Sequence, residues 1–239
     1  MLAIALSELI QIFRNRLALI TSFIMPVAVC AFFIRQHEQF AALGSLGYIA
    51  AVVIFTVGVF GLYTGTVTTL AARRQNLFLK RLRSTAADDV GILCGLLLPI
   101  TLIVLVQIVA ILCVLAVVTG APADILLLGA AVFLSLVMML GLGLATAGLT
   151  NSPEQAQITT LPVSLGVIAV VSWVGIAGTE DLTLLKRLLP GGAATELVGN
   201  AWHGGVAVAD SLPLFAPMLG WIVVAVALAS RLFRWEPRR

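Results

Sequence analysis

Six long stretches of this chain contain no Asp, Glu, Lys, Arg or His, and this feature constrains the fold most. They cover residues 17–34, 41–72, 90–123, 125–153, 155–179 and 211–230. An α-helix that crosses the hydrocarbon core of a membrane needs about 20 apolar residues. A chain that spans lipid must also satisfy its own backbone hydrogen bonds, which a helix does. The sequence therefore predicts an all-α, polytopic membrane protein.

The overall composition excludes a soluble domain. Only 14 of the 239 residues are Lys or Arg and 11 are Asp or Glu, so 10% of the chain is charged. Soluble domains carry about 25% charged residues. Hydrophobic residues make up 61% of the chain, which is more than a globule of this size can cover with polar groups. The basic residues follow the expected membrane borders, so no nucleic-acid partner is expected.

Each charge-free stretch is expected to cross the membrane once, within a single domain covering residues 1–239. The stretches 41–72 and 90–123 exceed one crossing but are too short for two crossings and a turn. The six predicted spans are residues 17–34, 43–70, 90–118, 125–149, 158–178 and 212–230.

The basic residues predict the orientation of these spans, because Lys and Arg are enriched on the cytoplasmic side. With a cytoplasmic N-terminus, eleven basic residues lie inside: Arg14, Arg16, Arg73, Arg74, Lys80, Arg81, Arg83, Arg231, Arg234, Arg238 and Arg239. Only Arg35, Lys186 and Arg187 then lie outside. Both termini are therefore predicted to be cytoplasmic.

Residues 2–16 have the pattern of an amphipathic helix. Phe13 lies on the apolar face, Glu8 and Arg14 lie opposite, and Arg16 follows at the end. Such a helix is suited to the cytoplasmic membrane interface. The alternative is that this segment extends the first span.

The segment RRQNLFLKRLRSTAADD separates the second and third spans and carries five basic residues followed by two acids. Thr85 and Asp88 have capping-box spacing, which predicts that the third span begins near Ala86. The preceding residues, with Lys80, Arg81 and Arg83, are predicted to form a short basic helix. By charge alone, that helix could equally be an anchor that contacts only lipid headgroups.

The loop NSPEQAQ between the fourth and fifth spans predicts another helix start, with Ser152 as N-cap, Pro153 next and Gln155 third. This predicted cytoplasmic loop has no basic residue and one acid, Glu154. That charge pattern is unusual for the cytoplasmic side, and a protein partner would explain it.

The last outer segment, residues 180–210, is too apolar for a free loop. Pro190, Gly191 and Gly192 are expected to break it into two short helices, as in a re-entrant hairpin. The alternative is a hydrophobic segment that lies on the outer membrane surface.

The sequence gives no sign of chemistry in the membrane. Cys30, Cys94 and Cys113 lie in apolar runs without metal-ligand spacing, and the P-loop pattern GxxxxGK[ST] is absent. Ion-coupled carriers usually keep an ionisable residue in mid-membrane, and the six stretches have none. If this chain transports a substrate, the energy is expected to come from another subunit.

In the order of these features the chain resembles the membrane subunit of type 2 ABC exporters, the ABC-2 type permeases. The resemblance covers nearly the whole chain. It is carried by the segments ELIQIFRNRLALITSFIMPV, LKRLRSTAADDVGILCGLLLP, LTNSPEQAQITTLPVSL and LLPGGAATEL.

The resemblance implies six spans, an N-terminal interfacial helix, a re-entrant external hairpin before the last span, and two cytoplasmic contacts with a separate ATPase. On this chain the implied coupling residues are Lys80, Arg81, Arg83, Asp88, Glu154 and Gln155. The implied partners are a P-loop ATPase subunit, a second permease copy and membrane lipid. ATP and Mg²⁺ would bind in the ATPase subunit, and the permease would hold no cofactor and catalyse no reaction.

The expected function is therefore export of an apolar or amphiphilic substrate, such as a drug, antibiotic or lipid, across a bacterial plasma membrane. Two other readings remain at this point. An ion-coupled secondary transporter is disfavoured by the uncharged spans, and a membrane scaffold or enzyme by the lack of clustered polar residues.

Overall fold

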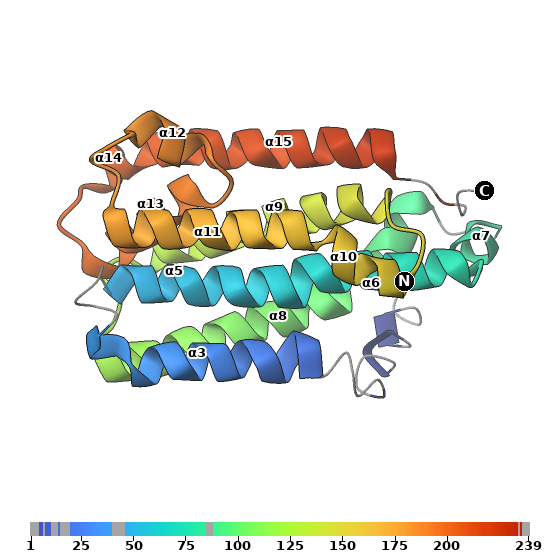
Figure 1. The fold of residues 1–239 in the computed structure, drawn as a ribbon, viewed down its shortest axis with the longest axis horizontal. Coiled ribbons are helices and arrows are strands. Elements are labelled where there is room, and N and C mark those ends of the chain that lie inside the picture. Colours follow the sequence, from blue (N-terminus) through green and yellow to red (C-terminus); the bar gives the residue numbers. More distant parts are fainter. Residues whose placement is uncertain are drawn as a thin grey trace.

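The structure, a computed structural model, describes residues 5–6, 8–10, 14, 20–39, 46–84, 88–233 and 235. These residues form helices joined by short connections, with no strand among them (Figure 1). For this part of the chain the all-α prediction is confirmed.

Five helices are long and apolar enough to cross a membrane: Leu46–Gln75, Asp89–Thr119, Ile125–Ala147, Pro153–Ala177 and Val208–Leu232. They overlap the last five predicted spans. The first predicted span, residues 17–34, lies partly outside the described residues. Its described part is helical, with a π-helical turn η1 (Ile20–Ile24) followed by α3 (Met25–Arg35). A multi-pass helical membrane protein is thus supported, and the count of six stays a prediction.

Three of the long helices are composite. The first joins α5 (Leu46–Val57), the π-helical segment η2 (Gly58–Tyr63) and α6 (Thr64–Gln75). Another joins α10 (Pro153–Thr159) to α11 (Leu161–Ala177), with Pro162 in the first turn of α11. The last joins α14 (Val208–Ser211), the 3-10 turn η3 (Leu212–Leu214) and α15 (Phe215–Leu232). The remaining two are α8 (Asp89–Thr119) and α9 (Ile125–Ala147).

Side-chain caps set the starts of three of these helices. The Asp88 carboxylate accepts from the backbone N–H of Gly91, and Asp124 accepts from that of Leu127. The Ser152 hydroxyl accepts from the backbone N–H of Gln155 at 3.2 Å, as the sequence predicted. The predicted start of the third span near Ala86 is wrong by three residues, because Asp88 itself is the N-cap and α8 begins at Asp89.

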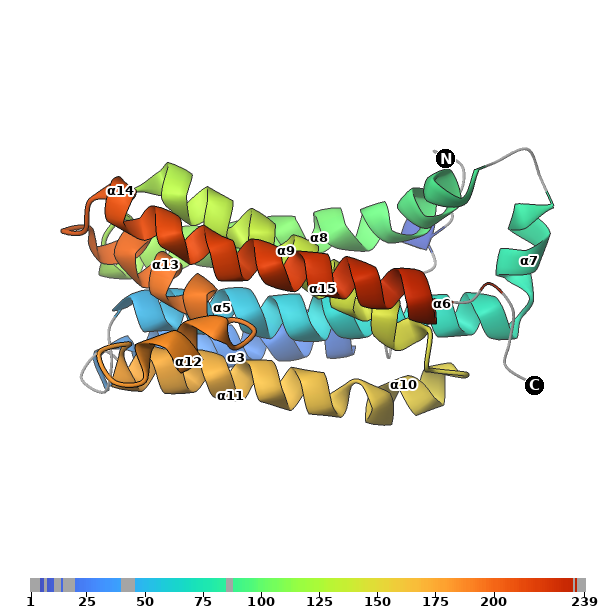
Figure 2. The same cartoon turned by 90° about the horizontal axis from the view of Figure 1, so that it is seen from above.

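The long helices lie side by side and alternate in direction, so their ends gather at two opposite ends of the bundle (Figures 1 and 2). We call one the basic end. It contains the end of α6, the short helix α7 (Phe78–Arg83), the start of α8, the end of α9, and α10. We call the other the hairpin end, after α12 (Thr183–Leu188) and α13 (Gly192–His203).

The helix formed by α5, η2 and α6 is the centre of the bundle. Its apolar side chains are almost all buried, and it contacts α8, α9, α11 and α13. Glycines permit the closest approaches: a Cβ at Gly65 would overlap the Ile100 side chain, and one at Gly143 would press on Thr66. By contrast α8, α11 and α15 each keep an exposed apolar face, which suits contact with lipid.

The outer segment forms two short helices, as predicted, with the break at Pro190 and Gly191. Gly191 has φ +94°, a backbone conformation that favours glycine. After the break α13 turns back into the bundle and packs against α5, α9 and α11, and its Leu197 and Val198 are fully buried. That the segment is a re-entrant hairpin in a membrane stays a prediction.

The two ends of the bundle should be reached by a membrane-impermeant thiol reagent from opposite sides. Lys80 is exposed at the basic end and Leu184 is 73% exposed at the hairpin end. On a background lacking Cys30, Cys94 and Cys113, we expect Lys80→Cys to react only in inverted vesicles and Leu184→Cys only in intact cells. Reaction of both from the same side would contradict the crossing pattern. Lys186 is a poor probe because it is buried.

Candidate functional site

The short basic helix α7 is fixed to the end of the bundle by its apolar residues. Leu77 adopts a left-handed conformation, with φ 55°, that turns the chain between α6 and α7. Leu79 is fully buried, and the Arg73 guanidinium lies 5.3 Å from the centre of the Phe78 ring. With these residues facing inward, Lys80 and Arg81 are left exposed. The helix thus presents positive charge outward from a fixed base.

Two of the predicted coupling residues have structural partners at the start of α8. The Arg83 guanidinium donates to the Asp89 carboxylate at 3.1 and 3.3 Å and lies 5.2 Å from the Trp235 ring. Asp88 caps α8. Arg83 therefore links α7 to α8, and Asp88 stabilises the start of α8. Arg81 donates to the Asn76 carbonyl at 3.1 Å, and Arg81, Arg83 and Asp88 are all exposed.

The start of α10 carries the other two predicted residues, Glu154 and Gln155. The Gln155 side-chain carbonyl accepts from the backbone N–H of Asn151 at 2.8 Å, which closes the turn before the helix. Glu154, in the first turn of α10, is exposed. The structure thus places all six predicted coupling residues at the basic end, on two segments, and all six are exposed.

The predicted interfacial helix is described only in part, and Phe13 and Arg16 lie outside the described residues. Arg14 is exposed and helical. Glu8, predicted on the polar face, is buried, and its carboxylate accepts from the Arg73 guanidinium at 2.7 Å. The two partners are 65 positions apart, so the sequence near either residue gives no sign of this ion pair.

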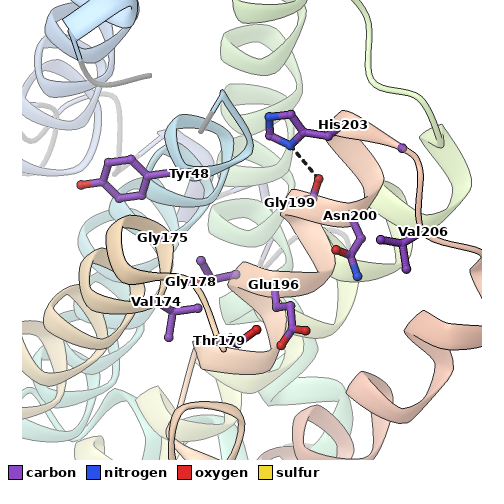
Figure 3. Close-up of a pocket in the computed structure, with 12 residues that line it drawn as sticks. Tyr48, Val174, Gly175, Gly178, Thr179, Glu196, Gly199, Asn200, His203 and Val206 are labelled. Carbon is purple, nitrogen blue, oxygen red and sulfur yellow. Dashed lines mark hydrogen bonds between the residues drawn. The ribbon is translucent and has the colours of Figure 1, made fainter. Parts of the chain in front are cut away.

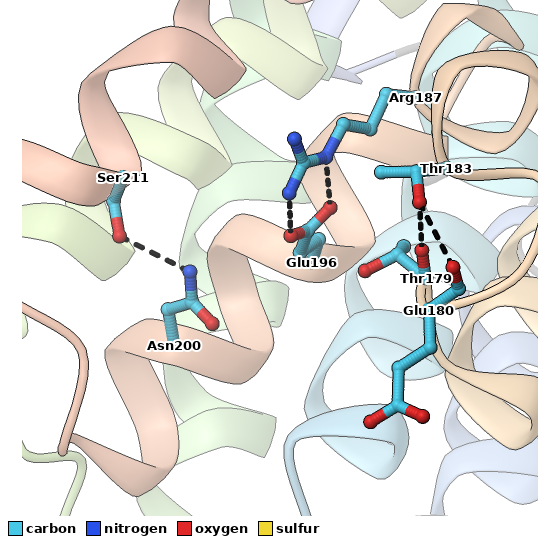
Figure 4. Close-up of polar contacts among 7 residues, drawn as sticks. All are labelled: Thr179, Glu180, Thr183, Arg187, Glu196, Asn200 and Ser211. Atoms are coloured by element: carbon cyan, nitrogen blue, oxygen red, sulfur yellow. Dashed lines mark hydrogen bonds and ion pairs between the residues drawn. The ribbon is translucent and has the colours of Figure 1, made fainter.

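The hairpin end is held by polar contacts that sequence reasoning did not find (Figure 4). The Arg187 guanidinium donates two hydrogen bonds, of 2.7 and 2.5 Å, to the Glu196 carboxylate and so ties α12 to α13. The Asn200 amide donates to the Ser211 hydroxyl at 3.1 Å, which joins α13 to α14. Hydrogen bonding to Glu196 raises the pKa of Arg187 above its already high value, so this guanidinium stays charged in any ordinary buffer.

Lys186 is the buried cation of this end. Its ammonium donates to the carbonyl of Gly178, the residue at the end of α11, at 2.7 Å. It also lies 5.2 Å from the centre of the Trp173 ring. A cation satisfies helix-terminal carbonyls well, because the C-terminal end of a helix carries partial negative charge. Lys186 thus links α12 to α11. Its location outside the membrane stays a prediction.

A cavity of about 330 Å³ opens at the hairpin end between α5, α11 and α13 (Figure 3). Tyr48 and Val174 contribute apolar surface, while Glu196, Asn200 and His203 contribute polar groups. The His203 ring is oriented by its Nδ1, 3.0 Å from the Gly199 carbonyl oxygen. A mixed lining of this kind suits a small amphiphilic molecule.

No group of three or more His, Cys, Asp or Glu side chains among the described residues could hold a metal ion. Comparison of the chain with models of known protein families gives no match, and comparison with curated proteins gives none either.

The Arg187–Glu196 pair should stabilise the hairpin measurably. In Glu196→Gln the paired charge is lost while the side-chain shape is kept, and we expect a destabilisation of about 1 kcal/mol because Arg187 is partly exposed. Thermal unfolding of the purified protein in detergent measures it. Glu180→Gln, an exposed acid of the same segment, is the control. Equal melting temperatures for Glu196→Gln and the control would contradict a structural role for the pair.

Proposed function

We propose that this chain is the membrane subunit of an ATP-binding-cassette exporter, driven by a separate P-loop ATPase subunit. The observation that carries the proposal is the set of exposed charges at the basic end. Charges of both signs are exposed on two segments that hydrogen bonds and buried side chains fix in place: Lys80, Arg81, Arg83, Asp88 and Glu154. Fixed segments with outward charges of both signs suit a protein partner better than lipid headgroups, which would favour positive charge alone.

The absence of a P-loop from the sequence assigns ATP hydrolysis to the partner. The ATPase would bind ATP and Mg²⁺, dock on α7 and on the start of α10, and move the helices through these contacts. In the five long apolar helices, the charged side chains lie at or near the helix ends: Arg73, Arg74, Asp89, Glu154, Asp210 and Arg231. This distribution favours an externally driven transporter over an ion-coupled carrier.

The proposed substrate is apolar or amphiphilic. The exposed faces of α8, α11 and α15 are almost wholly aliphatic, with exposed Val106, Val109, Leu165, Val223 and Val226. A path lined by such faces would be formed with a second permease copy, and lipid would cover the remainder. A bacterial plasma membrane with both termini cytoplasmic is the proposed location.

Charge reversal of the outward residues should uncouple transport without affecting insertion. In Glu154→Lys and Arg81→Glu a charge at the proposed ATPase contact would face a like charge, which weakens association by about tenfold or more. We expect reduced ATPase copurification and lost transport at normal membrane abundance. Arg231→Glu, an exposed reversal on α15, is the control. If Glu154→Lys and Arg81→Glu both bind ATPase and transport like the parent protein, the proposed contact is wrong.

The chain purified alone should show no ATP turnover, because it lacks the residues that hold the phosphates of ATP. Adding the ATPase subunit should produce turnover that responds to amphiphilic compounds. The measurement is phosphate release across the gel-filtration profile of the purified chain. Turnover that follows the chain through further purification, with no ATPase in the fractions, would contradict the assignment.

A further inference from the structure

Arg74, in the last turn of α6, is the buried cation of the basic end. It is 1% exposed, although the sequence placed it among residues that mark the cytoplasmic border. Its guanidinium donates to the carbonyl oxygen of Ala147 at 2.8 Å and to that of Thr150. Ala147 is the last residue of α9, and Thr150 lies three residues beyond it. Arg74 therefore joins α6 to the end of α9.

This contact satisfies two groups that would otherwise be costly to bury. The last carbonyls of a helix lack partners within the helix and carry partial negative charge. A buried guanidinium needs several acceptors, since an unpaired charge in an apolar environment is strongly unfavourable. Separating α6 from α9 would leave both the α9 carbonyls and the Arg74 guanidinium without hydrogen-bond partners. The two helix ends are therefore expected to stay together.

The end of α9 is in turn joined to α10. The Thr150 hydroxyl, which is fully buried, lies 2.8 Å from the Thr159 hydroxyl. It also donates to the Thr146 carbonyl at 2.9 Å, and the Tyr63 hydroxyl lies 3.0 Å from the Thr146 hydroxyl. Polar contacts thus run from η2 and α6, through the end of α9, to α10.

The turn that leads into α7 begins at Arg74. Its own carbonyl accepts from the backbone N–H of Leu77 at 3.0 Å, in the turn that separates α6 from α7. The neighbouring Arg73 makes different contacts, with Glu8 and Phe78. The turn into α7 therefore begins at the residue whose guanidinium contacts the end of α9, so this side chain fixes the base from which α7 starts.

We propose that Arg74 is a positioning residue that fixes α7 and the start of α10 as one rigid unit, so that a displacement of either segment also moves the end of α9. Its role in coupling rests on the proposed function, whereas the rigidity it creates is a property of this chain alone. A displacement at either proposed ATPase contact would be transmitted to α9 and to the central helix through the Arg74 guanidinium.

The rigidity can be measured without any ATPase. Spin labels at Lys80→Cys and Gln157→Cys, both exposed, report the separation of α7 and α10 in the purified chain in lipid nanodiscs, on the background lacking Cys30, Cys94 and Cys113. We expect one narrow distance distribution for the parent protein. Arg74→Met should broaden and shift it, because the neutral side chain cannot bond the α9 carbonyls. Arg231→Met, at an exposed basic residue, should leave it unchanged.

Helix content and gel-filtration volume establish that each variant is folded. If Arg74→Met cannot be recovered from membranes, Thr159→Val takes its place, because it removes only the hydroxyl contact between α9 and α10 and should also broaden the distribution. A folded Arg74→Met protein with the parent distribution overturns the proposal, as does an unchanged Thr159→Val if that variant has to be used.

The two proposals fail separately. A broadened distribution in a chain that binds no ATPase would leave the positioning role of Arg74 in place and remove the exporter function. If the distribution is unchanged but the chain binds an ATPase and transports substrate with it, the exporter function stands and the positioning role of Arg74 is wrong.

Discussion

The structure depends on hydrogen-bond partners for the backbone groups at buried helix ends, in a chain that has few polar side chains. A helix leaves its last four carbonyls unpaired, and water is absent where the ends are buried. Here a buried cation on a neighbouring element bonds such carbonyls at each end of the bundle. Arg74 on α6 donates to the end of α9, and Lys186 on α12 donates to the end of α11. Both charges are at least 98% buried, so each contact also supplies the partners that the cation needs.

These two contacts lie at opposite ends of the bundle, and the two ends carry different features. At the basic end, Arg74 joins α6, which leads into α7, to the end of α9, which leads into α10. Lys80, Arg81 and Glu154 are exposed on α7 and α10. At the hairpin end, Lys186 and the Arg187–Glu196 pair hold α12 against α11 and α13, and α13 lines a cavity of about 330 Å³. The central helix α5–η2–α6 reaches from one end to the other. In the proposed function, this helix would carry a displacement from the ATPase contacts at one end to the cavity at the other.

Much of the fold could be predicted because its signals are local. Charge-free stretches predicted the long helices, Ser152 and Pro153 predicted the start of α10, and Pro190 with Gly191 predicted the break between α12 and α13. The prediction was wrong at the start of α8, because Thr85 and Asp88 are both possible N-caps and lie close together. The helix was predicted to begin near Ala86, whereas it begins at Asp89. The local signals were silent on Glu8–Arg73 and on Arg74, because these partners lie 65 or more residues apart. At the candidate site, the sequence predicted the short basic helix and the capped start of α10, but not the ion pair between Arg83 and Asp89. The role of these segments in coupling stays a prediction.

The central claim is that this chain transports its substrate with energy from ATP hydrolysed by another subunit. The most direct test is uptake of a fluorescent amphiphile into inverted membrane vesicles that contain the chain and its copurifying ATPase. We expect uptake that requires hydrolysable ATP and continues after an ionophore has collapsed the proton gradient. Uptake that stops with the ionophore, and that an imposed proton gradient restores without ATP, would instead identify an ion-coupled carrier and contradict the account.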